Sequence, residues 1–371
     1  MIRIALDILS VVLGAGLMLF QQRVAADFGV PEWAISAVIL TAGIWLLLRG
    51  GDVLVEGAVT IAKRLGVAPL IIGLTVVAFG TSAPELAFNT IAASKGNDAL
   101  SFGNVVGSNI ANIGLILGIG ALIAPLAVHR QVIKREMPIM LMATVLFTAL
   151  ILLPWSSDRA VESGLSRGDA GVLLAAFLAF FGATIYFARK DKKVEAYIEE
   201  EAETFSEVRD LPLRPMWQGV VLFVIGLVML VGGGQLGETG ASGVARALGL
   251  SDALIGLTIV AIATSLPELA TTLAAIKRNE VDIAVGNVVG SNIFNLLLIF
   301  GCTALVNPVG LPAEGGLLTL GVMVALSFLL YPMSRTGGRT LSRIEGCLLL
   351  LGYAAYIAYA VFDELRNGGA A

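Results

Sequence analysis

Residues 77–87 read VAFGTSAPELA, and residues 260–270 repeat this stretch as VAIATSLPELA. A second block, GNVVGSNI, stands unchanged at residues 103–110 and again at residues 286–293. Both pairs of blocks are separated by the same offset of 183 positions, with no gap between them. A constant offset over two separate blocks indicates that the chain consists of two copies of one structural unit.

The composition indicates that both copies lie in a membrane. Hydrophobic residues make up 57% of the chain and charged residues only 14%, and the mean hydropathy is +0.88. A soluble domain is about half apolar and about a quarter charged. Apolar runs of the ~20 residues needed to cross a bilayer recur along the chain. The sequence therefore predicts an all-α polytopic membrane protein.

Ten transmembrane helices are expected, as two inverted repeats of five. The predicted spans are 34–62, 67–93, 101–124, 131–153, 168–188, 217–245, 250–276, 283–306, 312–332 and 344–362. Five spans separate equivalent points of the two copies. Because five is odd, the second copy must cross the membrane in the opposite sense, as in many secondary transporters.

Basic residues give the orientation. If the first span enters from outside, most Lys and Arg residues fall in cytoplasmic loops, including Lys63, Arg64, Lys277 and Arg278. This distribution follows the positive-inside rule. We therefore expect a multi-pass protein of the cell (inner) membrane.

Four segments are expected along the chain. Residues 1–26 form either a signal peptide or an extra anchor, because an apolar stretch follows Arg3. Residues 34–188 form the first inverted repeat and residues 217–362 the second. The polar stretch 189–216, basic and then acidic, is expected to be a cytoplasmic linker.

The repeated Pro-Glu motifs predict broken helices. Proline lacks the N–H that would bond the carbonyl four residues earlier. Pro84 therefore frees the carbonyl of Gly80, and Pro267 frees that of Ala263. Free carbonyls at membrane depth are tolerated where they line a cavity or are buried in protein. They are also suitable ligands for hard cations such as Ca²⁺.

Each motif also places an acid, Glu85 or Glu268, near the middle of an apolar span. A charge there costs at least ~2.5–3.5 kcal/mol, so such residues are usually functional. The alternative is a protonated packing residue. Two carboxylates could neutralise one divalent cation, and Ca²⁺ accepts 6–8 oxygen ligands in flexible geometry.

The GNVVGSNI blocks have two interpretations. Gly103 and Gly107 have the small-xxx-small spacing that brings helices together, and packing is as good an explanation for them as ligation. Ser108 and Asn112, at i and i+4, share one helix face, as do Ser291 and Asn295. These pairs could line a cavity beside the broken helices.

At these residues the chain resembles the cation/calcium antiporter superfamily, and most closely its prokaryotic sodium/calcium exchangers. The resemblance covers the ten spans and implies alternating access around central cation sites. It places Ca²⁺ at Glu85, Glu268, Thr81 and Thr264. It assigns Na⁺ to a larger set of residues: Ala78, Ser82, Ser108, Ala261, Ser265, Ser291, Asn112 and Asn295. Related exchangers can carry an acid at the position of Asn295, and asparagine there weakens the case for potassium co-transport.

The expected function is secondary antiport of Na⁺ against Ca²⁺, electrogenic and directed to Ca²⁺ export, without a cofactor. A Ca²⁺/H⁺ antiporter on the same fold is the alternative, because Glu85 and Glu268 could also carry protons. A passive channel fits less well with discrete carboxylate sites. An enzyme is not expected, since His129 is the only histidine and no His-Glu-x-x-His motif occurs. The expected partners are the two ions and the lipid bilayer, with no nucleic acid, and a monomer is compatible with the sequence.

Overall fold

The computed structural model describes residues 16–18, 27, 30–153, 164–190, 214–249 and 261–367. In this part of the chain, eight helices are long and apolar enough to cross a membrane. They are Glu32–Leu65 (α2), Asp98–Ile123 (α6, η2 and α7), Val132–Leu152 (η3 and α8), Arg167–Lys190 (α9), Met216–Ala247 (α11), Val281–Val306 (α15, η5 and α16), Gly316–Met333 (α17) and Arg343–Asn367 (α18). The chain is thus a polytopic helical membrane protein.

A bent pair of helices is long and apolar enough to count as a ninth span if its two parts are taken together. Pro69–Thr81 (α3, η1 and α4) and Ala83–Ser94 (α5) meet at an angle of 42°. The predicted span 250–276 is described only in its second part, as Ala261–Ala263 (α13) and Leu266–Lys277 (α14). The segment expected to be a signal peptide or anchor lies almost wholly outside the described residues, as does most of the expected linker. The division into four segments therefore stays a prediction.

The prolines mark the breaks, as predicted. Ser82 separates α4 from α5 with φ −87° and ψ 3°, and Ser265 precedes α14 with nearly the same values, −90° and 2°. Pro84 and Pro267 each stand in the first turn of the helix that follows. A missing N–H costs little there, because the first amides of a helix have no partner within it. Each span therefore stops and restarts at the level of its glutamate.

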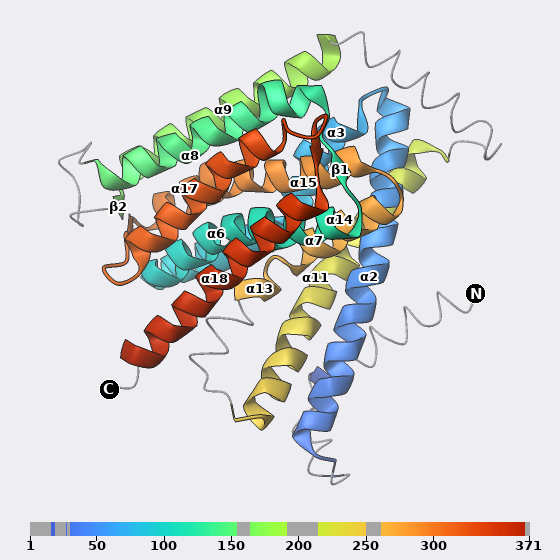
Figure 1. The fold of residues 1–371 in the computed structure, drawn as a ribbon. Helices are drawn as coiled ribbons and strands as arrows, with labels where there is room; N and C mark the ends of the chain where they lie inside the picture. Colours follow the sequence, from blue (N-terminus) through green and yellow to red (C-terminus); the bar gives the residue numbers. More distant parts are fainter. Residues whose placement is uncertain are drawn as a thin grey trace.

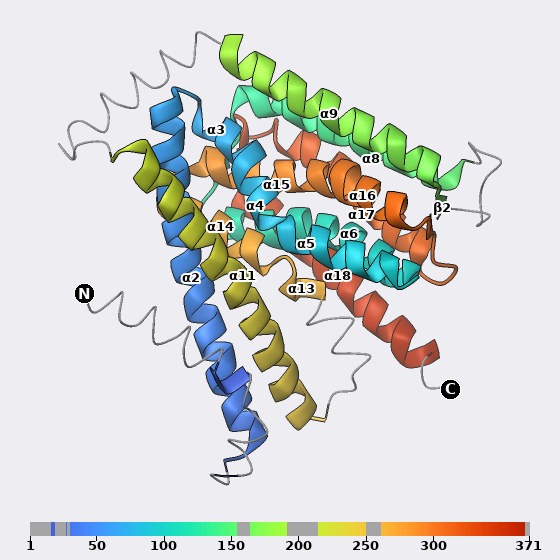
Figure 2. The ribbon, with the colours of Figure 1, turned by 180° about the vertical axis from the view of Figure 1, so that it is seen from behind.

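The long helices α2 and α11 lie side by side along the edge of the bundle (Figures 1 and 2). Glycines spaced seven residues apart face each other across their interface: Gly43, Gly50 and Gly57 on α2, and Gly226, Gly233 and Gly240 on α11. A Cβ at Gly226 would lie 2.4 Å from the backbone nitrogen of Leu54. The two backbones are therefore in direct contact, as small residues permit between membrane helices.

Two short antiparallel ribbons join the halves of the chain. Leu126–Ala127 (β1) pairs with Thr340–Leu341 (β4), and Gly164–Leu165 (β2) pairs with Val309–Gly310 (β3). In each ribbon, one strand comes from the first half of the sequence and the other from the second. Strands β1 and β3 are separated by the same 183 positions as the repeated motifs. The ribbons are therefore reciprocal contacts between the two copies.

A group of charges ties α2 to its neighbours at one end. Glu56 pairs with Arg214 at 2.6 Å and with Arg278 at 3.2 Å. Asp52 lies 3.8 Å from Arg278 and 3.9 Å from Arg49. These side chains are partly exposed, so each pair contributes little on its own. Together they connect α2 with the end of α14 and the start of α11.

We expect Glu56→Gln to lower the stability of the folded protein by about 0.5–1 kcal/mol, because two partly exposed ion pairs are lost. The loss should shrink in high salt, which screens such pairs. Thermal unfolding in detergent at low and high salt measures both effects. Glu314→Gln, at an exposed position in the connection before α17, is the control. An equal change in both variants would contradict the assignment.

Candidate functional site

The two acidic motifs meet in the interior. Glu85 on α5 and Glu268 on α14 are each only 1% exposed. The Ser82 hydroxyl donates a hydrogen bond to Glu268 Oε1 at 3.1 Å. Ser82 stands three residues before Glu85 in the first motif. Two segments far apart in the sequence thus place two buried carboxyl groups at one site.

The threonine of each motif binds an asparagine of the other copy. Thr81 Oγ1 donates to Asn287 Oδ1 at 3.2 Å, and Thr264 Oγ1 donates to Asn104 Oδ1 at 3.1 Å. Thr264 is the equivalent of Thr81 in the second copy, and Asn104 is the equivalent of Asn287 in the first copy, each at the offset of 183 positions. The two contacts are therefore the same contact with the copies exchanged. Donating the proton leaves the lone pairs of each hydroxyl oxygen free, so the threonines can present both their hydroxyl and their backbone oxygens to an ion.

Two pairs of asparagines make reciprocal contacts of the same kind between the copies. Asn112 Nδ2 donates to Asn292 Oδ1 at 3.0 Å, and Asn295 Nδ2 donates to Asn109 Oδ1 at 3.1 Å. Reciprocal contacts of this kind are produced by a two-fold relation, in which residue i meets j and j meets i. They agree with the inverted-repeat plan, in which a site lies where the two copies meet.

Seven side-chain oxygens of the repeated motifs and of the helices that follow them are buried and, among the described residues, lack hydrogen-bond partners. They are Oε2 of Glu85 and Glu268, Oγ of Ser108, Ser265 and Ser291, and Oδ1 of Asn112 and Asn295. A buried polar atom without a partner costs about 1–3 kcal/mol. A bound cation would coordinate such oxygens and remove this cost. All seven belong to residues that the sequence analysis selected as ligands.

The other selected residues differ in what they offer. The Ala78 carbonyl accepts the Ser82 N–H at 3.0 Å and also lies 3.4 Å from the Thr81 hydroxyl. Ala261 begins α13, one turn before Ser265. The two serines of the broken helices also differ, because Ser82 is bonded to Glu268 whereas the Ser265 hydroxyl has no partner in the described structure.

Sequence reasoning missed several polar side chains of this region. Asn89 Oδ1 and Thr271 Oγ1 are buried without described partners and lie within about one turn of Glu85 and Glu268. Asn109 and Asn292 support the amides of Asn112 and Asn295. Asn109 and Asn292 stand inside the repeated GNVVGSNI block, so the repeat itself could have selected them.

The donor set determines which ions suit the site. It consists of oxygen atoms from carboxylates, hydroxyls and amides. In the described part of the chain, no three His, Cys, Asp or Glu side chains come together as a metal cluster. Oxygen donors in flexible number suit hard cations, whereas zinc prefers nitrogen and sulfur ligands. The site is therefore suited to ions such as Na⁺ and Ca²⁺.

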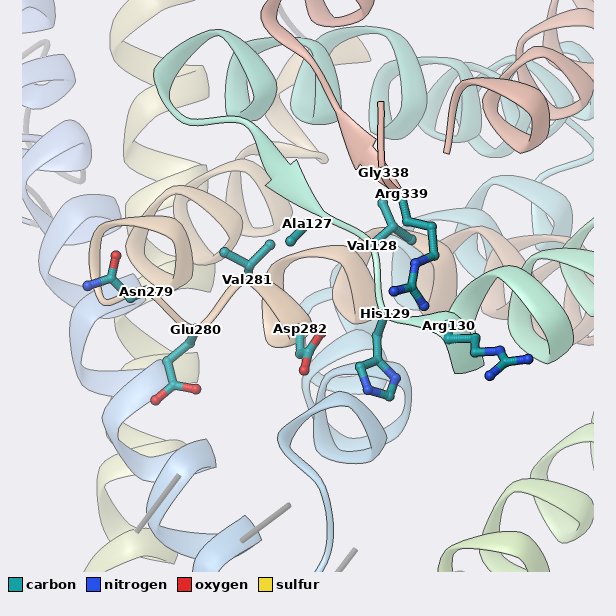
Figure 3. Close-up of a pocket in the computed structure, with 10 residues that line it drawn as sticks. All are labelled: Ala127, Val128, His129, Arg130, Asn279, Glu280, Val281, Asp282, Gly338 and Arg339. Atoms are coloured by element: carbon teal, nitrogen blue, oxygen red, sulfur yellow. The ribbon is translucent and has the colours of Figure 1, made fainter. Parts of the chain in front are cut away.

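A separate cavity of about 450 Å³ lies beside β1 (Figure 3). It is lined by residues of the β1–η3 loop, the α14–α15 connection and the approach to β4, including His129, Arg339 and Asp282. None of the residues selected as ion ligands lines it. The cavity is therefore distinct from the site around the glutamates.

The fold and the buried polar site indicate a membrane carrier whose candidate ion site is built from two related halves. A family model described as sodium/calcium exchanger protein matches residues 35–186 and 218–362. The chain belongs to this family of antiporters, and the predicted resemblance to the prokaryotic exchangers is confirmed.

Individual relatives agree with this assignment. CaxA of Alkalimonas amylolytica, named as a candidate antiporter, is 37% identical over 332 residues, which are 89% of this chain and 99% of that protein. The sodium/calcium exchanger MaX1 of Methanosarcina acetivorans is 32% identical, over 87% of this chain and 97% of that one. A solved structure of the sodium-calcium exchanger NCX_Mj matches with a TM-score of 0.72 and 32% identity, over 88% of this chain and 98% of the other.

A more distant relative is named for a different activity. The Ca²⁺/H⁺ antiporter ChaA of Bacillus subtilis is 25% identical over 320 residues, which are 82% of this chain and 86% of that protein. Family membership alone therefore does not decide between sodium and proton as the coupling ion.

Proposed function

We propose that this chain exchanges Na⁺ for Ca²⁺ across the membrane by alternating access. The observation that carries the proposal is the set of seven buried, unpartnered side-chain oxygens, which includes those of Glu85 and Glu268. Two carboxylates neutralise one Ca²⁺, and the surrounding oxygens complete a flexible coordination sphere. The names of MaX1 and NCX_Mj, which both describe sodium/calcium exchange, support the same ion pair.

The residues are assigned as follows in this proposal. Ca²⁺ binds the carboxylates of Glu85 and Glu268 and the backbone oxygens of Thr81 and Thr264. Sodium ions use the flanking oxygens of Ala78, Ser82, Ser108, Ala261, Ser265, Ser291, Asn112 and Asn295. Both cargoes need the same two carboxylates. Competition for them makes binding of one ion exclude the other, which is the basis of exchange.

The charge of the empty site also explains why movement of one ion is coupled to movement of the other. An empty site leaves two carboxylates in the interior without a counter-ion, and buried unpaired charge is unfavourable. Conversion between outward-open and inward-open states is therefore disfavoured without cargo, so that uncoupled leak is suppressed. If more sodium charge than calcium charge moves in each cycle, transport responds to voltage by ~2.3 kcal/mol per elementary charge and 100 mV. Inward movement of sodium then drives calcium out of the cell.

Exchange of Ca²⁺ for H⁺ is the second candidate, supported by the similarity to ChaA. Glu85 and Glu268 would then carry protons in place of sodium. The serine hydroxyls favour sodium, because Ser108, Ser265 and Ser291 present unpartnered oxygens that proton transfer to the glutamates would not need.

Flux measurements separate the two candidates. Purified protein is reconstituted in liposomes loaded with Na⁺ or with choline at the same pH inside and outside, and uptake of labelled Ca²⁺ is followed after dilution into sodium-free buffer. Sodium/calcium exchange predicts uptake in the sodium-loaded vesicles alone. Uptake in choline-loaded vesicles that follows an imposed pH gradient would assign the proton-coupled activity instead. Protein-free liposomes are the control for leak.

A further inference from the structure

The two ends of an asparagine amide differ in their use to a cation. The oxygen accepts and can coordinate a cation, whereas the NH₂ group donates and repels it. Asn112 and Asn295 serve as ion ligands only if their oxygens face the ion. Neighbouring groups must therefore determine the orientation of each amide.

Two buried methionines determine the orientation of these neighbouring amides. Asn292 Nδ2 lies 3.8 Å from Met140 Sδ, and Asn109 Nδ2 lies 3.7 Å from Met323 Sδ. Both methionines are at most 1% exposed. A thioether sulfur carries no proton and can only accept, weakly. The end of each asparagine that faces the sulfur must therefore be its NH₂ group.

The orientation of the first amide then fixes the orientation of the second; we call each such set of one methionine and two asparagines a relay. With its nitrogen turned to Met140, Asn292 presents its oxygen to Asn112, at 3.0 Å from Nδ2. The nitrogen of Asn112 is thereby engaged, and its oxygen remains without a partner in the described structure. Met323, Asn109 and Asn295 form the same chain from the other copy, with a free oxygen on Asn295. All three pairs of equivalent residues keep the offset of 183 positions.

We propose that Asn109 and Asn292 are positioning residues of the ion site, and that Met140 and Met323 set their direction. Each relay turns the oxygen of Asn112 or Asn295 toward the transported cation and keeps the NH₂ group away from it. This inference rests on the proposed function, in which these two oxygens coordinate the cargo. It assigns a role to four residues that do not themselves touch the ion.

Packing alone explains these contacts less well. A leucine at either relay position would fill a buried apolar place without burying an amide. Burying an amide whose donor meets only sulfur is unfavourable, because neutral polar groups lose their bonds to water. The asparagines therefore lower stability at these positions. Orientation of the ligand amides explains their presence better than packing does.

The test compares Asn292→Leu and Asn109→Leu with Met140→Leu and with the control Met142→Leu. Met142 is 61% exposed on the same helix as Met140. Without the relay, each ligand amide can turn its NH₂ group to the ion. We expect the KM for Ca²⁺ to rise about tenfold in both asparagine variants, equivalent to ~1.4 kcal/mol, with the maximal uptake rate nearly unchanged. Met140→Leu should raise the KM by about two- to threefold, and Met142→Leu should leave it unchanged.

Ca²⁺-dependent thermal stabilisation in detergent distinguishes positioning from a structural role. The Tm without Ca²⁺ should change little, because removal of one buried amide is offset by the Asn112 or Asn295 donor that loses its partner, while the increase in Tm caused by added Ca²⁺ becomes smaller. An unchanged KM, or an equal fall of Tm with and without Ca²⁺, would overturn the relay. The same assay separates it from the proposed function: if the unsubstituted protein shows no sodium-driven uptake but is stabilised by Ca²⁺, only the exchange assignment fails.

Discussion

We expect sodium-driven Ca²⁺ uptake to fall by at least about a hundredfold in Glu85→Gln and in Glu268→Gln. Glutamine keeps the shape of the side chain but removes one of the two charges that balance Ca²⁺. The bound ion would then hold an unbalanced charge in the interior, and the effective penalty for a buried unpaired ion is several kcal/mol. Each 1.4 kcal/mol of lost binding is a factor of ten. Because both acids belong to one site, either substitution alone should give the full loss.

Reconstituted vesicles with equal amounts of protein measure this loss. Glu314→Gln, at an exposed residue of the connection before α17, is the matched control and should transport normally. Loss of activity through misfolding is excluded if the glutamine variants keep the Tm of the unsubstituted protein or exceed it, because a buried charge has been removed. Retained exchange in either variant would contradict a site that needs both carboxylates.

The second large effect is expected in the interface of α2 and α11. Gly226→Val should prevent recovery of folded protein, because a Cβ there lies 2.4 Å from the nitrogen and 2.6 Å from the Cα of Leu54. Neither atom belongs to a flexible side chain, so the helices must separate along their length. Overpacking by a methylene costs typically ~1–3 kcal/mol, and a clash with backbone exceeds that range.

Size-exclusion chromatography of detergent extracts measures the yield of folded protein. Gly232→Ala on the same helix is the control, since no atom of the described residues lies within 4 Å of a Cβ at Gly232. Alanine there should be neutral or stabilise the helix by up to ~1 kcal/mol. A normal yield of Gly226→Val would mean that α2 and α11 are not held in backbone contact.

Sequence reasoning succeeded where the cause is local. A proline in the interior of a helix removes a backbone hydrogen bond, and Pro84 and Pro267 stand in the middle of apolar spans, so breaks close to them could be expected from the sequence. The duplication could be read directly from the printed blocks. Burial of both glutamates followed from their position in apolar spans, and the structure confirms it.

The contacts between the copies could not be predicted in the same way. The bond from Thr81 to Asn287 joins residues 206 positions apart. It depends on how α4 and α15 are placed relative to each other, which no local pattern specifies. The π-helical segments Asn112–Leu117 (η2) and Phe294–Ile299 (η5) were also not expected. They include Asn112 and Asn295, in keeping with the occurrence of such irregular turns at functional sites.

The reciprocal ribbons have a consequence for biosynthesis. Strand β1 leaves the ribosome early, but its partner β4 begins at Thr340, more than two hundred residues later. At ~5–20 residues per second, the delay is roughly ten to forty seconds. During this time the first copy is in the bilayer with Asn109 and Asn112 still without the side chains that bind them. The newly made first half must therefore be protected by lipid, by the insertion machinery or by its own provisional contacts until its counterpart arrives.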